Sequence, residues 1–215
     1  KIRVLLPQSV VVDVQRTLGT VSFKAESLRG EELEVAERYQ LLVRAAVERK
    51  SVAMEYYTVS SGRVSQRLID PYHLRLADGT WYCIAYCHER TSIRTFALDR
   101  IIRLEVTDDT FEIPAGFSVE EYLADSLSIE RGTPRRVVIE FDPTQAAYIR
   151  GRQWHKSQEL TELPGGRLRM TVTIGGLGEL KRWVMSMGSH AQVLEPRELR
   201  DQIRRELESA ADKYR

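Results

Sequence analysis

Two arginines stand where the sequence pattern predicts an apolar β-strand. The stretch DGTWYCIAYCHERTSIRTFALDRI, residues 78–101, has the alternation and the turn residues of two strands. Its second strand, Ile93 to Leu98, carries Arg94 inside an apolar run, and Arg100 follows with the same parity. Guanidinium groups bind phosphate and carboxylate through paired hydrogen bonds. Because burying an unpaired guanidinium is costly, we expect Arg94 to lie at a barrel mouth, to pair with an acid such as Asp99, or to await an anionic ligand.

The strand before it, residues 80–87, has apolar or small side chains on both faces, which predicts a position inside a sheet. Alternation puts Tyr82, Ile84 and Tyr86 on one face, and Trp81, Cys83, Ala85 and Cys87 on the other. The two cysteines are the only ones in the chain. Their spacing on a strand separates them by roughly 13 Å, which is too far for a disulfide. Free thiols favour a reducing, cytoplasmic compartment.

The sequence lacks the motifs of common enzyme classes. It contains neither the G-x-x-x-x-G-K-[ST] phosphate loop nor the G-x-S-x-G nucleophile motif, and no set of Ser, His and Asp residues stands out. The glycines of GGLG, residues 175–178, open a helix that could bind an anion, but a plain turn is the stronger interpretation. We predict no enzyme activity, no cofactor and no metal, since the histidines form no metal-ligand spacing with the cysteines: His73, His88, His155 and His190.

Composition indicates a globular chain without a broad positive charge for nucleic acid. Of 215 residues, 42% are hydrophobic and 29% are charged, and the formal net charge is +1. Arginines make up 26 of the 32 positively charged residues, so only locally placed arginines can form an anion site. No apolar run approaches the roughly 20 residues of a membrane helix, and no signal peptide is visible. Since the chain does not begin with Met, Lys1 is expected to be a domain edge.

The first half predicts a connector followed by a small barrel. Residues 1–34 form a partly helical connector in this interpretation, and an apolar face predicts a helix at about residues 31–49. The barrel domain is assigned to residues 35–116, with five short strands up to about residue 113. Pro71 bends one of them, which restricts that strand to an edge or a bulge. The lack of long crossover helices between these strands favours a small closed β-barrel.

The second half predicts a linker and a second domain, so the fold class is α+β. Residues 117–134 contain a short helix and a Gly/Pro-rich link. Residues 135–215 follow the order β-α-β-β-α-β and end in a further helix, a ferredoxin-like, split-βαβ arrangement. Asp142, followed by Pro143, has the position of an N-cap for the first helix of this domain. Trp154 and Trp183 lie in apolar-periodic elements, so we expect both to be at least partly buried.

The stretch GTWYCIAYCHERTSIRTFALDRI resembles the signature of the WYL domain, which is named for a Trp-Tyr-Leu tripeptide. Trp81 and Tyr82 match the tripeptide, whereas Cys83 replaces its leucine and Ala97 stands in place of the usual second arginine. The preceding segment MEYYTVSSGRVSQRLIDPYHL is also similar to the family. RQWHKSQ and VLEPRELR are similar to the extension domain that often follows in bacterial regulators. The resemblance covers about residues 35–215.

This resemblance implies a five-stranded SH3-type, Sm-like barrel and a bacterial transcriptional regulator whose N-terminal helix-turn-helix binds duplex DNA. No helix-turn-helix is recognised in this sequence itself. The barrel would sense a nucleotide or single-stranded nucleic acid through polar and basic residues. By motif position the ligand-binding residues are Tyr56, His73, Arg94 and Arg100, with Tyr82 as a further candidate. Since helix-turn-helix proteins usually bind two-fold symmetric operators, we expect a cytoplasmic homodimer, with the apolar segment VVVDVQRTL as a contact surface.

Two other interpretations stay open at this point. The first is a stand-alone nucleic-acid-binding module that combines aromatic stacking with arginine–phosphate contacts. The second is a dimerisation or structural module, in which the arginines brace the fold against carboxylates. A net charge of +1 argues against broad non-specific DNA affinity. An anion site requires Arg94 to lack a full carboxylate partner or to share a cavity with Arg100, with Tyr56 and His73 nearby.

Overall fold

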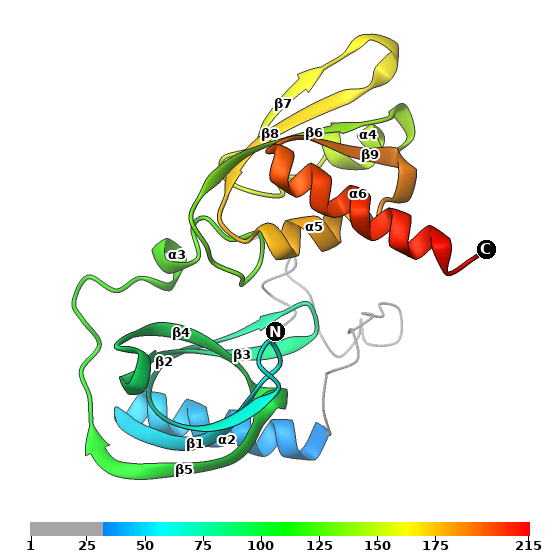
Figure 1. Ribbon diagram of the computed structural model, residues 1–215. Coiled ribbons are helices and arrows are strands. Elements are labelled where there is room, and N and C mark those ends of the chain that lie inside the picture. Colours follow the sequence, from blue (N-terminus) through cyan, green and yellow to red (C-terminus); the bar gives the residue numbers. More distant parts are fainter. Residues whose placement is uncertain (1–31) are drawn as a thin grey trace, which may run out of the picture.

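The computed structural model describes residues 32–215, which form two antiparallel β-sheets joined by a short segment (Figure 1). The first sheet follows helix α2, Glu32–Glu48. Its strand order is β4-β3-β2-β1-β5, with bounds Lys50–Thr58 for β1, Arg63–Ala77 for β2, Thr80–Cys87 for β3, Ser92–Ala97 for β4 and Ile101–Thr110 for β5. This helix and these strands lie where the sequence predicts them. The connector, and the contact surface expected within it, fall outside the described residues except for the first turn of α2.

The first sheet is open, so the prediction of a closed barrel is wrong. Strands β4 and β5 form its two edges, and within residues 32–215 no backbone pairing joins them. The connection between these strands gives the reason, because Leu98–Arg100 forms a 3-10 turn, η3, and buries Leu98 completely. Helix α2 adds Leu42 and Ala45 to the same core. The strands curl around an interior (Figure 1). Apolar side chains fill this interior, and no hydrogen-bonded seam between β4 and β5 is found among the described residues.

Strand β2 bends at Pro71, as the sequence predicts. The pairing of β2 with β3 shifts register between Pro71 and His73, which is the irregularity that a residue without a backbone N–H produces. Since β2 lies inside the sheet, Pro71 marks a bulge and not an edge strand. Asp78 and Gly79 form the turn to β3 with positive φ angles of 47° and 70°, a conformation that suits a two-residue hairpin.

Strand β3 is buried on both faces, which confirms its predicted place inside the sheet. Cys83, Ala85 and Cys87 face the core beneath α2, whereas Ile84 belongs to a separate apolar cluster. Both cysteines are free thiols, as expected. Burial raises the pKa of Cys83 to about 12, so this thiol is protonated and unreactive at neutral pH.

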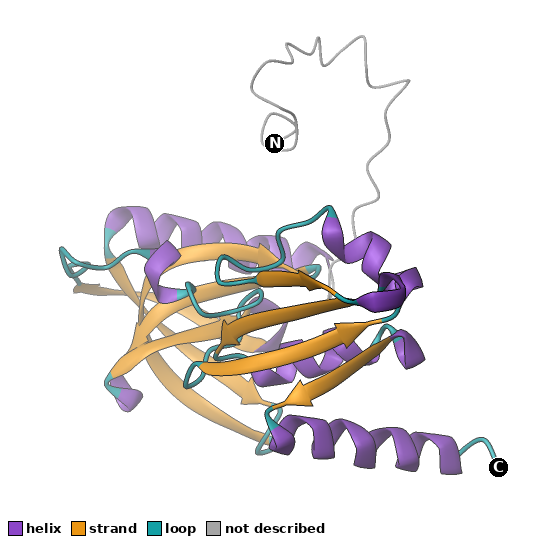
Figure 2. Cartoon of the chain, turned by 90° about the horizontal axis from the view of Figure 1, so that it is seen from above, coloured by secondary structure: helices purple, strands orange, loops and turns teal. Residues whose placement is uncertain are grey.

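The second sheet has the strand order β7-β8-β6-β9 and is also antiparallel. Asp142 caps its first helix by accepting a 2.9 Å hydrogen bond from the N–H of Gln145, with Pro143 in the first turn. The elements follow the predicted order β-α-β-β-α-β and end in helix α6, which extends beyond the sheet (Figure 2). Their bounds are Arg135–Phe141 for β6, Pro143–Arg150 for α4, Glu159–Glu162 for β7, Leu168–Ile174 for β8, Leu177–Met185 for α5, Ala191–Glu195 for β9 and Arg197–Asp212 for α6.

A third apolar cluster packs the segment after β5 onto the first sheet. Its buried members come from the first sheet and from the segment after β5: Ala77, Ile84, Leu123 and Ile129. The short helix α3, Val119–Tyr122, lies in this segment, and the Tyr122 hydroxyl donates a 3.0 Å hydrogen bond to the carbonyl oxygen of Ile93. We refer to residues 117–132 as the joining segment. The joining segment packs against the first sheet before the chain enters the second unit.

No helix in the described part of the chain is long and apolar enough to span a membrane.

Replacing Leu42 with alanine tests whether α2 supplies part of the first core. Leu42 is fully buried, whereas Leu33 on the same helix is 81% exposed. We expect Leu42→Ala to lower the free energy of unfolding by about 2–5 kcal/mol, because it removes buried surface and leaves a cavity. Leu33→Ala, the matched control, should change it by less than about 0.5 kcal/mol. Denaturant unfolding measures both, and equal effects would show that α2 is not part of the core.

Candidate functional site

A cavity of about 410 Å³ lies between the first sheet and the second unit. Three parts of the chain line it, namely strands β3 and β4 with the turn η3, the joining segment, and helix α5. The side chains include four arginines and two glutamates, a formal surplus of two positive charges. We call it the arginine cavity, and its lining residues are Tyr82, Ile93, Arg94, Thr95, Arg100, Tyr122, Ile129, Glu130, Arg131, Glu179 and Arg182.

Arg94 and Arg100 share this cavity and lack carboxylate partners. Arg94 is exposed, and its Nε donates a 3.1 Å hydrogen bond to the hydroxyl oxygen of Ser92. Among residues 32–215, no ion pair joins either arginine to an acid. Asp99 does not pair with Arg94, and its buried Oδ1 has no hydrogen-bond partner within the described residues. Arg94 and Arg100 therefore have the arrangement expected of an anion site and not that of a carboxylate brace, whereas Tyr56 and His73, also expected nearby, do not line the cavity.

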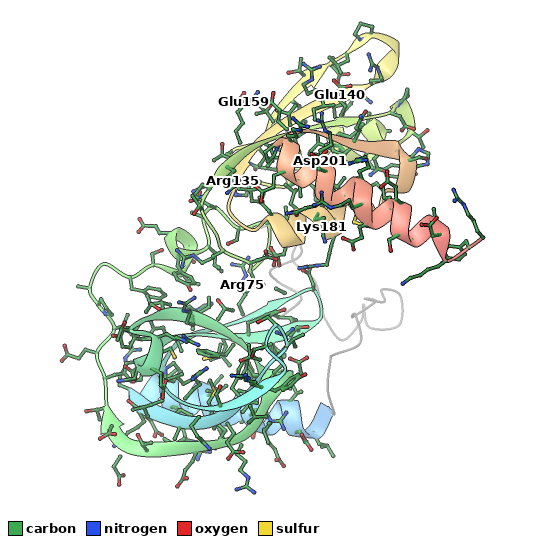
Figure 3. All side chains as sticks on the ribbon, viewed as in Figure 1. Arg75, Arg135, Glu140, Glu159, Lys181 and Asp201 are labelled. Carbon is green, nitrogen blue, oxygen red and sulfur yellow. The ribbon has the colours of Figure 1, made fainter. Side chains whose placement is uncertain are left out.

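The arginines of the second unit behave differently. Arg150 pairs with Glu162 at 2.7 Å, Arg169 with Glu140 at 2.5 Å and Arg135 with Glu198 at 2.6 Å. Figure 3 labels Arg135 and Glu140 on the second sheet. Solvated pairs of this kind contribute little stability, but they neutralise charge locally. Arg94 and Arg100 thus differ from these paired arginines in keeping their charge unneutralised by a carboxylate among the described residues.

Tyr56 lies beneath the arginines and does not line the cavity. Its side chain is buried, and its ring meets that of Phe96 edge-on at a centroid distance of 5.2 Å. The Tyr56 hydroxyl oxygen accepts hydrogen bonds from the N–H of Ala97, at 3.2 Å, and from Arg100. Burial raises the pKa of Tyr56 and outweighs the lowering by these hydrogen bonds. Tyr56 therefore holds the turn η3 and the Arg100 guanidinium in position.

His73 lies apart from the other predicted residues. It is exposed on β2 and does not belong to the cavity lining. Its charged neighbour is Glu120, whose pKa is lowered chiefly by hydrogen bonds to its own backbone and to the Ser118 hydroxyl, with smaller effects from His73 and Arg75. Figure 3 shows Arg75 on the side of the first sheet that faces the second unit. The structure thus brings Tyr82, Arg94 and Arg100 into one lining, Tyr56 just below it, and His73 outside it.

The carboxylate of Glu179 fixes the joining segment onto helix α5. It accepts hydrogen bonds from three consecutive backbone N–H groups, those of Ser128 at 3.0 Å, Ile129 at 3.0 Å and Glu130 at 2.8 Å. Glycines allow the two backbones to meet, since a Cβ on Gly176 would lie 2.3 Å from the carbonyl oxygen of Glu130. The side chains of residues 130 and 131 are consequently held at the cavity wall.

The start of α5 binds an internal carboxylate. Glu130 Oε1 accepts a 3.0 Å hydrogen bond from the N–H of Gly178, and its Oε2 lies 3.5 Å from Arg182. The glycine-rich stretch at residues 175–178 therefore opens a helix, and its Gly178 N–H binds a carboxylate of the chain itself, so the plain-turn interpretation is wrong. The Arg131 guanidinium lies 3.8 Å from the ring centroid of Tyr122, a favourable cation–π contact.

Sequence reasoning missed the half of the cavity that the second unit supplies. Glu130, Arg131 and Tyr122 lie in the segment interpreted as a linker, and Glu179 and Arg182 lie in a helix interpreted only by its apolar face. The available signal was the run of charges in SIERG and GELKR next to glycines. Such runs usually mark solvated surfaces, so only the tertiary packing identifies them as cavity residues.

Two family models match this chain. A WYL domain matches residues 37–106, and a WCX domain matches residues 133–211. The WYL match contains all five predicted ligand residues. The WCX match contains the two residues of helix α5 that line the cavity. The joining segment with Tyr122, Glu130 and Arg131 falls between the matched ranges.

Curated relatives include two proteins of different coverage. Protein PafC of Mycobacterium tuberculosis (strain CDC 1551 / Oshkosh) is 25% identical over 214 residues, covering 96% of this chain and 63% of the relative. The uncharacterized HTH-type transcriptional regulator YobV of Bacillus subtilis (strain 168) is 36% identical over 69 residues, covering 32% of this chain and 22% of the relative. This chain thus spans less than two-thirds of the length of these relatives.

Two solved structures are also similar. A CRISPR Cas-related protein is 10% identical with a TM-score of 0.53, covering 85% of this chain and 51% of that one, which indicates a shared fold alone. Proteasome accessory factor B/C (PafBC) of Arthrobacter aurescens is 25% identical with a TM-score of 0.38, covering 94% of this chain and 30% of that one.

Removing the Tyr56 hydroxyl tests its role below the cavity. In Tyr56→Phe the ring contact with Phe96 is kept, but the buried N–H of Ala97 loses its acceptor. We expect the free energy of unfolding to fall by about 1–3 kcal/mol. Tyr57→Phe is the matched control, because Tyr57 is 40% exposed on the same strand. Denaturant unfolding compares them, and a Tyr56→Phe variant as stable as the control would contradict this role.

Glu179→Gln tests the hold on the joining segment. The amide keeps one acceptor oxygen but turns an NH₂ group toward backbone N–H donors, so we expect a loss of about 1–3 kcal/mol in the free energy of unfolding. Trypsin should also cleave at Arg131 faster in the variant under native conditions, because the segment is released locally. Glu206→Gln, which removes an exposed ion pair with Lys181, is the control. Unchanged stability and cleavage in Glu179→Gln would exclude the proposed hold.

Proposed function

We propose that this chain, in which a WYL match is followed by a WCX match, is the effector-sensing part of a bacterial transcriptional regulator. The whole protein would bind duplex DNA through a helix-turn-helix outside this chain. The similarity to the HTH-type transcriptional regulator YobV of Bacillus subtilis supports this class. So does the pairing of a WYL match with a WCX match in one chain.

One observation carries the proposal about the effector, namely that Arg94 and Arg100 line a single cavity without carboxylate partners among the described residues. Such guanidinium groups hold phosphate through charge-assisted hydrogen bonds. Tyr82 supplies an aromatic side chain in the same lining, and a tyrosine ring stacks on nucleobases. The effector class that fits is a nucleotide or a short single-stranded nucleic acid. The volume of about 410 Å³ suits a ligand of that size.

The five sequence-predicted residues have different roles in this proposal. Arg94 and Arg100 bind phosphate, Tyr82 contacts a base, and Tyr56 positions Arg100 from below. His73 lies outside the lining, so it would contact only a ligand that extends beyond the cavity, such as a single strand.

Several finer features belong to the same proposal. We assign residues 35–116 to an Sm-like, SH3-type unit, residues 117–134 to a linker and residues 135–215 to a ferredoxin-like extension domain. The observed sheet orders support these fold names without reproducing a closed barrel. A cytoplasmic homodimer is the expected assembly, since operators for helix-turn-helix proteins usually have two-fold symmetry. Light scattering on the whole protein that shows a monomer at all working concentrations would contradict the dimer.

The two alternatives, a stand-alone nucleic-acid-binding module and a structural module, each require features other than a small anion site. A structural role for Arg94 and Arg100 calls for carboxylate partners, which the described residues do not supply. Stand-alone binding of duplex DNA calls for a broad basic surface, whereas the formal net charge is +1. Both arguments favour a small, local anion site over these alternatives.

Arg94→Ala tests the sensor site. We expect the affinity for a short single-stranded oligonucleotide to fall about tenfold to a hundredfold, because a charged hydrogen-bond donor to phosphate is lost. Stability should change little, since Arg94 is exposed. Fluorescence anisotropy at low salt measures binding, and thermal unfolding measures stability.

The control is Arg63→Ala, because Arg63 is an exposed arginine of the same sheet outside the cavity. It should bind the oligonucleotide like the unaltered chain. If Arg94→Ala unfolds the protein, or binds with unchanged affinity, Arg94 is structural and the sensor-site proposal is wrong.

A further inference from the structure

A second cavity adjoins the arginine cavity and has a different chemistry. Its volume is about 390 Å³, and it lies between the β2–β3 turn and helix α5. Glu179 and Arg182 belong to the linings of both cavities, so the two share a wall. We call it the tryptophan cavity, and its lining residues are Asp78, Leu127, Ser128, Trp154, Glu179, Arg182, Trp183 and Ser186.

The charges of the two cavities differ in sign. The arginine cavity has four arginines against two glutamates, whereas the tryptophan cavity has Asp78 and Glu179 against Arg182 alone. A phosphate is therefore repelled from the second cavity and attracted to the first. A neutral, planar group suits the second cavity, because most of its exposed lining belongs to apolar atoms and two of its walls are indoles.

The two indoles are held in place before any ligand arrives. Trp154 and Trp183 lie with ring centroids 4.9 Å apart at a tilt of 55°. Trp183 also packs edge-on against the buried Phe141, and the Arg152 guanidinium lies 4.6 Å from the Trp154 ring centroid. An aromatic wall that is already packed loses little conformational entropy when a ligand binds.

Arg182 is the residue that can contact a ligand in both cavities. Its side chain is 68% exposed, and its ion pair with Glu130 is long, at 3.5 Å. An arginine with so weak a partner can turn to a phosphate that lies at the shared wall, since exposed ion pairs contribute little free energy. A ligand with alternating phosphates and planar rings would therefore fit across the wall.

We propose that the tryptophan cavity is a second subsite that binds a nucleobase of the same ligand whose phosphate occupies the arginine cavity. This proposal rests on the proposed function and deepens it, because it assigns one end of the ligand to each cavity. The phosphate binds Arg94 and Arg100, Arg182 lies between the subsites, and the base enters between Asp78 and the indoles. Asp78 accepts a hydrogen bond from an exocyclic amino group, which favours adenine, cytosine and guanine over thymine.

An abasic oligonucleotide separates base binding from phosphate binding. We expect the full chain to bind a short single strand of deoxyadenylates about tenfold or more tightly than an abasic strand of the same length, because only the first offers rings to the indoles. Binding of the base-bearing strand should also quench tryptophan fluorescence, since two of the three tryptophans line the second cavity. A strand of thymidylates should bind more weakly than the deoxyadenylate strand.

Ser186→Phe blocks the tryptophan cavity without touching the arginine cavity, because Ser186 lines only the former. In this variant the base-bearing and abasic strands should bind alike, and the quench should disappear. Ser186→Ala controls for the lost hydrogen bond from the Ser186 hydroxyl to the Trp183 carbonyl oxygen. Ser189→Phe, at an exposed position outside the lining, controls for the introduction of a bulky ring. Both controls should retain the preference and the quench.

The outcomes distinguish the two proposals. If the unaltered chain binds the base-bearing and abasic strands equally well, the second subsite is overturned while the phosphate site stands. If it binds neither strand, the proposed function fails, and the second subsite fails with it. A Ser186→Phe variant that keeps the full preference for the base-bearing strand would place the base elsewhere and overturn the assignment to this cavity.

Discussion

The carboxylate of Glu179 is the interaction on which the rest of the site depends. Three consecutive backbone N–H groups of the joining segment, at residues 128–130, donate to it. Buried donors of this kind must be paired, because an unsatisfied N–H loses the hydrogen bond that water would supply. The single side chain thereby fixes the segment between two units and brings Glu130, Arg131 and Arg182 opposite Arg94 and Arg100. Loss of this contact would release the joining segment from helix α5 and disturb the cavity wall that the two form.

The positions of the Arg94 and Arg100 guanidinium groups are compatible with a cavity without a ligand and with one that holds an anion. Arg94 is exposed and hydrogen-bonded only to Ser92 within the described residues, so its guanidinium is accessible to water and, in the proposed function, to a phosphate. A fully buried arginine in the same place would need a permanent acid partner. Tyr56 helps to position the Arg100 guanidinium, because its hydroxyl oxygen accepts a hydrogen bond from Arg100 without neutralising its charge. An acceptor that carries no charge leaves the full positive charge available to an incoming phosphate.

Local chemistry predicted the elements, whereas tertiary packing decided the site. Alternation, the Asp78-Gly79 turn and the Asp142 cap placed the strands and α4 close to their observed bounds. The closed barrel failed because the η3 turn buries Leu98 and α2 fills the interior, and neither effect has a local signature. The sequence predicted three of the residues that line the cavity, Arg94, Arg100 and Tyr82. The other side of the cavity comes from residues 122–131 and 179–182, and a charged residue in a loop or helix gives no indication of what it will face.

The three residues that align with the Trp-Tyr-Leu tripeptide, Trp81, Tyr82 and Cys83, have different environments, which explains why a substitution is tolerated at the third position. The ring of Trp81 packs against Tyr39 of α2 at a centroid distance of 4.5 Å, whereas Tyr82 lines the arginine cavity. Cys83 points into the fully buried core and meets only the demand for apolar volume. A smaller thiol can replace a leucine there if neighbouring side chains close the gap, and its raised pKa keeps it neutral. Trp81 and Tyr82 therefore lie on opposite faces of β3. Through these two consecutive residues, one strand contacts both helix α2 and the arginine cavity.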